Sequence, residues 1–194
     1  MDKSTKFKVT VITIVGVFFT WIYVNRRWLT DLSSLRNSER LTEEPVGSTV
    51  NGKREGKWTV YYTNGELERE EHYKNDTLNG DQFLYYGNGQ LHIKRKYWKG
   101  RQIDSAIWYH SNGLKNIEEF RDSLGRTQGL FKIYYPGGQP SQIANHKAGM
   151  LDGESRTFFV KGQLRAIGRY RSNQKIGKWI EFSENGDTTK VVDY

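Results

Sequence analysis

The chain of 194 residues contains no cysteine. This absence excludes disulfide bonds, a thiol nucleophile and a lipid-modified cysteine as a membrane anchor. It does not identify a compartment, because a protein without cysteine suits oxidising and reducing surroundings equally.

Motifs for catalysis or metal binding are also lacking. The four histidines show no His-x-x-x-His spacing, no serine lies in a Gly-x-Ser-x-Gly setting, and no phosphate-binding or dinucleotide-binding glycine loop is present. The acidic run at residues 66–71 alternates along a predicted strand, which indicates a solvated face rather than an acid/base pair. We therefore expect no enzyme, no metal and no cofactor.

Long apolar runs are limited to a single uncharged segment, residues 9–24, with lysines before it and arginines after it. As a helix it would be about 24 Å long, somewhat short of the roughly 30 Å hydrocarbon core, although flanking Lys8 and Arg26 can reach the interface. No small-residue cleavage site follows, since Asn25-Arg26-Arg27-Trp28 comes next. We expect residues 1–27 to form a retained signal anchor. A cleaved signal peptide and a buried helix are the alternatives.

The charges near this span do not favour one orientation in the membrane, because the numbers of lysines and arginines close to its two ends are almost equal. A short N-terminus favours an exported, periplasmic position for the rest of the chain. Residues 28–50 are polar, include Ser33-Ser34 and Gly47-Ser48, and are expected to form a linker.

The remaining residues repeat one unit of about 24 residues six times. A leading glycine is followed by a bulky doublet and a turn, as in Gly56…Tyr61-Tyr62…Asn64-Gly65 and Gly80…Tyr85-Tyr86…Asn88-Gly89. Such a period indicates an architecture in which each unit contacts chiefly its neighbours. The six units have these limits: 51–74, 75–98, 99–121, 122–146, 147–170 and 171–194.

Aromatic residues recur at two offsets within the unit. Because strand side chains alternate between faces, each offset predicts a row on one face of a sheet. The first row is Tyr61, Tyr85, Tyr109, Tyr134, Phe158 and Phe182. The second row is Tyr73, Tyr97, His146, Tyr170 and Tyr194, with Phe120 one place early and with Leu67, Leu91 and Leu164 expected on the same face.

The turn residues fit strands rather than helices. Asn-Gly pairs tolerate the positive φ that tight hairpins require, and the flanking segments are rich in aromatic and β-branched residues. The turn glycines are Gly65, Gly89, Gly113, Gly138, Gly162 and Gly186. We expect an all-β, elongated antiparallel meander of six β-hairpins, twelve strands in all, after one N-terminal transmembrane helix.

The formal net charge of +8 is spread along the chain, with the densest cluster at residues 94–101. Lys94, Lys96, Lys99 and Arg101 are a candidate surface for an anionic partner, either lipid headgroups or an acidic protein. The alternative is a solubilising face that discourages edge pairing. Nucleic-acid binding is not expected, because acidic residues are interspersed.

The pattern Gly56-Lys-Trp58-Thr-Val-Tyr61-Tyr62-Thr-Asn64-Gly65-Glu-Leu67 resembles the MORN repeat, and more closely the bacterial MORN-variant repeats labelled as antitoxin components. The resemblance covers residues 51–194, although Asp104 replaces a leading glycine and Lys161 a turn asparagine. It implies a hairpin array used for protein or lipid contact.

These observations predict a membrane-anchored, non-enzymatic interaction scaffold with an unknown protein partner. An antitoxin-like neutraliser of a toxin and a tether to anionic lipid are the alternatives. The last strand, at residues 188–192, is expected to be open to pairing with a partner strand or with a second copy.

Overall fold

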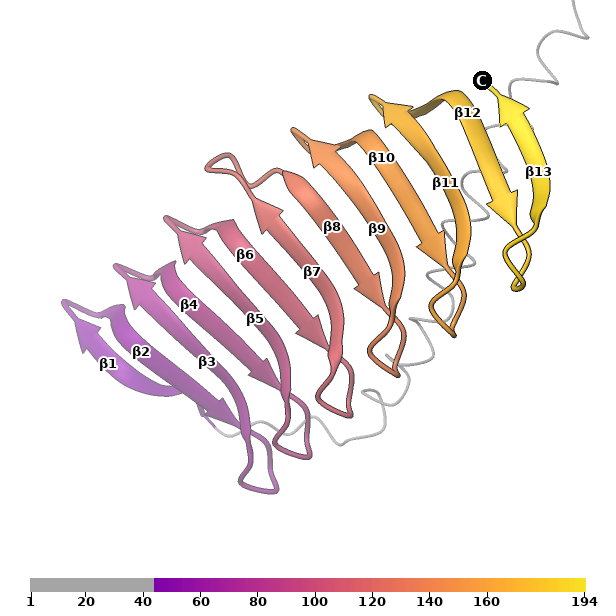
Figure 1. Ribbon diagram of the computed structural model, residues 1–194. Helices are drawn as coiled ribbons and strands as arrows, with labels where there is room; N and C mark the ends of the chain where they lie inside the picture. The colour runs from indigo at the N-terminus through magenta and orange to yellow at the C-terminus, as the bar shows by residue number, and fades with distance from the viewer. Residues whose placement is uncertain (1–43) are drawn as a thin grey trace, which may run out of the picture. The chain divides into compact units, whose positions relative to one another are not determined.

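A computed structural model describes residues 44–194. The predicted membrane span at residues 9–24 and most of the predicted linker lie outside these described residues. Residues 44–194 form one antiparallel sheet of thirteen strands that follow one another in chain order (Figure 1). The strands are β1 (Val46–Val50), β2 (Lys53–Tyr61), β3 (Leu67–Lys74), β4 (Thr77–Tyr85), β5 (Leu91–Trp98), β6 (Arg101–Tyr109), β7 (Lys115–Arg121), β8 (Gly129–Tyr134), β9 (Pro140–Lys147), β10 (Met150–Phe158), β11 (Leu164–Arg171), β12 (Gln174–Phe182) and β13 (Thr188–Asp193).

The predicted all-β meander is therefore confirmed, with thirteen strands in place of twelve. The additional strand is β1, which lies in the segment predicted to be linker and pairs with β2 from Val46 to Val50. Its short polar sequence does not stand out as a strand, and it is ordered by the neighbour it pairs with.

Two kinds of connection alternate along the sheet. At one end, two-residue turns with positive φ at both positions join an odd strand to the next even one, as at Asn51-Gly52 and Ser172-Asn173, except between β7 and β8. This is the backbone of the tight turns that match the twist of antiparallel strands. At the other end, wider loops close with a hydrogen bond from the turn glycine, such as Gly65 N to Tyr62 O at 2.9 Å.

The leading residue of five units lies inside a strand, at a β-bulge, whereas Gly129 is the first residue of β8. All six leading positions have positive φ, including Asp104 with a φ of 65°. Opposite the first of them the pairing shifts, so that Gly47 faces Trp58 and Ser48 faces Glu55. The stretch of residues 51–56 is thus mostly strand, and only Asn51 and Gly52 turn the chain.

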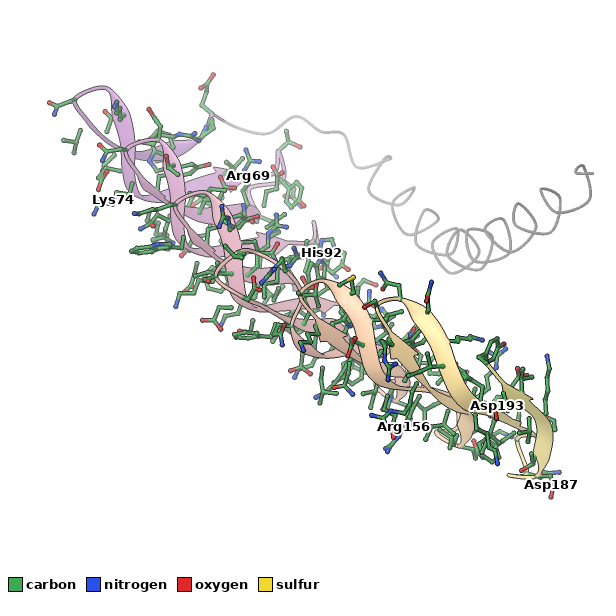
Figure 2. The ribbon with its side chains drawn as sticks, turned by 90° about the horizontal axis from the view of Figure 1, so that it is seen from above. Arg69, Lys74, His92, Arg156, Asp187 and Asp193 are labelled. Atoms are coloured by element: carbon green, nitrogen blue, oxygen red, sulfur yellow. The ribbon has the colours of Figure 1, made fainter. Side chains whose placement is uncertain are left out.

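The two faces of the sheet differ in burial. The eight buried side chains among the described residues are Val60, Glu71, Tyr73, Gln82, Ala106, Glu119, Ala144 and Ser155. Strand register and alternation place all eight on one face, which we call the core face, and the opposite one the outer face. Side chains project from both faces along the whole sheet (Figure 2).

No other element covers either face within residues 44–194, which contain strands and turns only. Burial on the core face therefore comes from neighbouring side chains of the same sheet. In this part of the chain there is also no helix with the length and apolarity needed to cross a membrane.

Candidate interaction surface

The first aromatic row lies on the outer face. Tyr61 follows the buried Val60 in β2, so its side chain points away from the core face, and the other five members occupy the equivalent place in their strands. All six are half-buried. The sheet thus presents a line of partly exposed rings, the residue type that most often anchors protein interfaces.

Burial and neighbouring carboxylates raise the pKa values of two tyrosines in this row. The hydroxyl of Tyr134 donates a hydrogen bond of 2.9 Å to Glu118, which also lies 3.1 Å from the Lys115 ammonium. Burial, followed by the Glu118 carboxylate, raises the pKa of Tyr134 to about 12. Burial likewise raises the pKa of Tyr85, with a further contribution from Glu70.

The second row lies on the core face. Tyr73 is buried, Tyr97 pairs with Gly80, and His146 contacts the ring of Phe131 with centroids 5.3 Å apart. At the other end of the row, Tyr170 and Tyr194 pack edge-on against Trp179 with ring centroids 5.0 and 6.4 Å away. Burial lowers the pKa of His146, as expected for a ring that replaces an apolar residue.

The three leucines expected on the second-row face are displaced from it. Leu67, Leu91 and Leu164 pair with members of the first row, because a register shift at each wide loop inserts one extra residue. Phe120 pairs with Ser105 on the outer face, and Arg121 takes the second-row place opposite Asp104. The prediction of the face of the three leucines was wrong, because alternation changes parity at a bulge, whereas the position of Phe120 agrees with its arrival one place early.

The second residue of each bulky doublet has a role that the sequence analysis missed. The hydroxyl of Tyr62 donates to the carbonyl oxygen of Tyr85 at 2.7 Å, and Tyr86 donates to Tyr109 at the same distance. Tyr135 continues the series by donating to Phe158 at 2.8 Å. In the third unit, Nε2 of His110 lies 3.1 Å from the backbone carbonyl oxygen of Tyr134.

These four bonds join consecutive units at a spacing of 23 or 24 residues, and we call them the inter-unit ladder. The sequence signal for it was the recurrence of a hydroxyl-bearing or ring-nitrogen residue immediately after the first-row position. Phe159 stands at the fifth place and brings no such group.

Carboxylates are buried on the core face, which corrects the expectation that the acidic run at residues 66–71 is solvated. Glu71 accepts hydrogen bonds from Gln82 and from the Tyr73 hydroxyl. A second carboxylate, Glu119, accepts from the Arg121 guanidinium at 2.6 Å and from Thr127 at 3.2 Å. Each is supplied with donors, as buried acids require.

The candidate basic surface is divided between an outer-face strand and a turn. Lys94 and Lys96 lie on the outer face opposite Phe83 and Asp81, as expected from alternation. Lys96 is 3.7 Å from Asp104, whereas Lys99 lies over the Trp98 ring at the tight turn. The Arg101 guanidinium donates to the Ser123 carbonyl at 3.2 Å.

The described residues contain no group of three or more acidic or histidine side chains able to hold a metal ion. Two surface hollows have volumes of about 280 and 440 Å³, the first bordered by Arg169 and Lys178, the second by Lys74 and Trp98.

The geometry defines an open, single-layered β-hairpin repeat protein. The family model of the MORN repeat variant matches residues 54–75, 78–99 and 127–148. These three matches support placing the repeats in the MORN-repeat family.

No curated protein matches the chain. One solved structure that it resembles is the "Crystal structure of GtfA/B complex bound to UDP and GlcNAc", with 18% sequence identity and a TM-score of 0.28 over 65% of this chain. The chain spans 23% of that structure's chain, and a similarity of this size carries no argument.

Proposed function

We propose that the sheet is a non-enzymatic platform for binding a protein partner. The observation that carries this proposal is the first aromatic row, whose six rings are half-buried on a face that no described element covers. Backbone pairing between successive strands and the inter-unit ladder fix the spacing of these rings, so little order has to be created on binding.

The rest of the described sheet supports binding rather than chemistry. The carboxylates of Glu71 and Glu119 accept hydrogen bonds from neighbouring donors, and the His146 ring is packed against Phe131. Groups held in this way stabilise the sheet.

We also propose that residues 9–24 anchor the platform in a bacterial membrane as a single pass, with the repeats on the exported side. The uncharged segment and its basic flanks support the anchor. Protease digestion of intact spheroplasts tests the orientation, because a C-terminal tag on an exported sheet is cut without lysis.

Two rival functions keep the same architecture. An antitoxin-like neutraliser would bind one cognate toxin, and a lipid tether would contact anionic headgroups through Lys94, Lys96, Lys99 and Arg101. The interspersed acids, such as Asp104 beside Lys96, weaken the second.

Site-specific photo-cross-linking tests the platform directly. A photoreactive residue replaces Tyr109 on the outer face, and a matched control replaces Trp108, its neighbour on the core face. We expect protein adducts from position 109 in the full chain and few from position 108. Adducts to lipid alone would support the tether, and no protein adduct from any first-row position would contradict the platform.

A further inference from the structure

The repeat is interrupted once, between β7 and β8. Residues 122–128 form a seven-residue loop where the other units have a two-residue turn, and Figure 1 shows it as longer than its neighbours. Insertions into a repeat array map to loops on one side of the array, which is often the binding side.

This loop is ordered by its own hydrogen bonds. The Asp122 carboxylate accepts from the backbone nitrogens of Leu124 and Arg126 at 2.9 and 3.0 Å, and from the Arg126 side chain at 2.9 Å. The loop is also attached on both sides, by Arg101 to Ser123 and by Gly149 N to Thr127 O at 2.9 Å. These contacts restrict the conformation of its backbone.

Exposed apolar side chains gather around the loop. Phe120, Leu124, Leu130 and Met150, which we call the insertion patch, are each 40–57% exposed. Phe120, Leu130 and Met150 alternate with core-face residues in their strands and so lie on the outer face. Backbone bonds from Gln128 to Phe120 and from Gly149 to Thr127 keep the three strand segments together.

Basic side chains lie on the same face as this patch and against its loop. Lys94 and Lys96 lie on the same outer face two strands away, and Arg101 contacts the loop itself. Among the described members of the candidate basic surface, Lys96 is paired with the carboxylate of Asp104. Lys94 and Lys99 instead lie over aromatic rings. The patch therefore combines an apolar centre with unneutralised positive charge.

We propose that the insertion patch binds an acidic, amphipathic segment of a protein partner. Apolar side chains of that segment would cover Leu124, Phe120 and their neighbours, while its carboxylates would face Lys94 and Lys99. Charge complementarity of this kind sets specificity and accelerates association, and the apolar centre supplies most of the affinity. The inference rests on the proposed function, because it names the surface and the chemistry of that partner.

The test uses phage-displayed random peptides of 16 residues, selected on the purified full chain, followed by synthetic fluorescent copies of the enriched sequences. We expect the enriched peptides to combine aspartate or glutamate with bulky apolar residues. Leu124→Asp should weaken their binding at least tenfold. Val160→Asp is the matched control, because Val160 is also a loop residue and is 63% exposed against 57% for Leu124.

Charge is tested with Lys99→Glu and its control Lys161→Glu, which lies in a loop at the opposite end of the strands. Lys99→Glu should weaken binding several-fold and reduce its dependence on salt, whereas Lys161→Glu should not.

Three results would overturn the inference. Peptides whose binding is insensitive to Leu124→Asp would place the partner elsewhere and leave the proposed function intact. A second result is that no peptide binds but the chain captures a differently tagged second copy, or vesicles of phosphatidylcholine with phosphatidylglycerol. If this capture depended on Leu124, the patch would have a different occupant. Failure to enrich any peptide would contradict both the inference and the proposed function.

Discussion

The indole of Trp179 lies directly against the backbone of Gly168, in the place where any larger residue would put its Cβ. Its Nε1 donates to the Arg169 carbonyl at 3.2 Å, and the Lys175 ammonium lies 4.3 Å from its ring centroid. Trp58 repeats this arrangement over Gly47 in the first unit. In the first and the last unit a tryptophan therefore packs on a glycine. In the units between them, the residues that take the place of the tryptophan are smaller or polar.

Gly168→Ala should destabilise the sheet by about 1–3 kcal/mol, because the new methyl group forces the indole or the strand to move. Gly87→Ala is the control, since nothing lies within 4 Å of its Cβ position and its φ is ordinary. Urea unfolding of the full chain measures the difference. Equal midpoints for the two variants would contradict the close approach.

The inter-unit ladder predicts that one substitution destabilises the sheet and that another stabilises it. Tyr62→Phe removes the hydrogen bond to the Tyr85 carbonyl and should cost about 0.5–1.5 kcal/mol. Phe159→Tyr supplies the missing hydroxyl and should stabilise the last two units by an amount within that range. Thermal unfolding compares both with the parent chain. A destabilised Phe159→Tyr variant would show that the last units do not share the spacing of the others.

Removal of the Glu119 carboxylate should be costly. Its side chain is 3% exposed and accepts from Arg121 Nε and from Thr127, so Glu119→Ala removes the acceptor of both groups. We expect a loss of about 1.5–3 kcal/mol in the free energy of unfolding. Glu184→Ala, which removes an exposed carboxylate 3.5 Å from Lys161, should cost less than about 0.5 kcal/mol.

Alkaline pH should destabilise the sheet through Tyr134. The pKa of this tyrosine is raised to about 12 in the folded chain, above the value of about 10 for an unfolded one. The unfolded chain therefore loses this proton first, and the stabilisation is present below pH 10 and is lost as pH rises toward 12.

Absorbance of ionised tyrosine follows this titration, with Tyr134→Phe identifying its contribution. Glu118→Gln should lower the pKa of Tyr134 but keep it above the ordinary value, because burial is the larger cause. Glu154→Gln, a carboxylate that pairs with Arg156, serves as the control. An unchanged titration in Glu118→Gln would contradict the role of the hydrogen bond.

Periodicity was enough to predict the meander and the positions of its turns, because glycine and asparagine recur where the backbone needs positive φ. It failed where a bulge changes parity. Leu67 was assigned to the wrong face, since simple alternation cannot anticipate an extra residue in one strand. Burial of Glu71 was also unpredictable, because its donors Gln82 and Tyr73 come from the adjacent strand and from the same strand two residues on.

The interrupted pairing of β7 with β8 has a mechanical consequence. Two Cα pairs and one isolated bridge join these strands, whereas other neighbouring strands share five or six pairs. A pulling force applied across the sheet loads every strand pair in series, so the weakest junction yields first. The sheet would then separate as two intact blocks, β1–β7 and β8–β13, with the seven-residue loop as the slack tether between them.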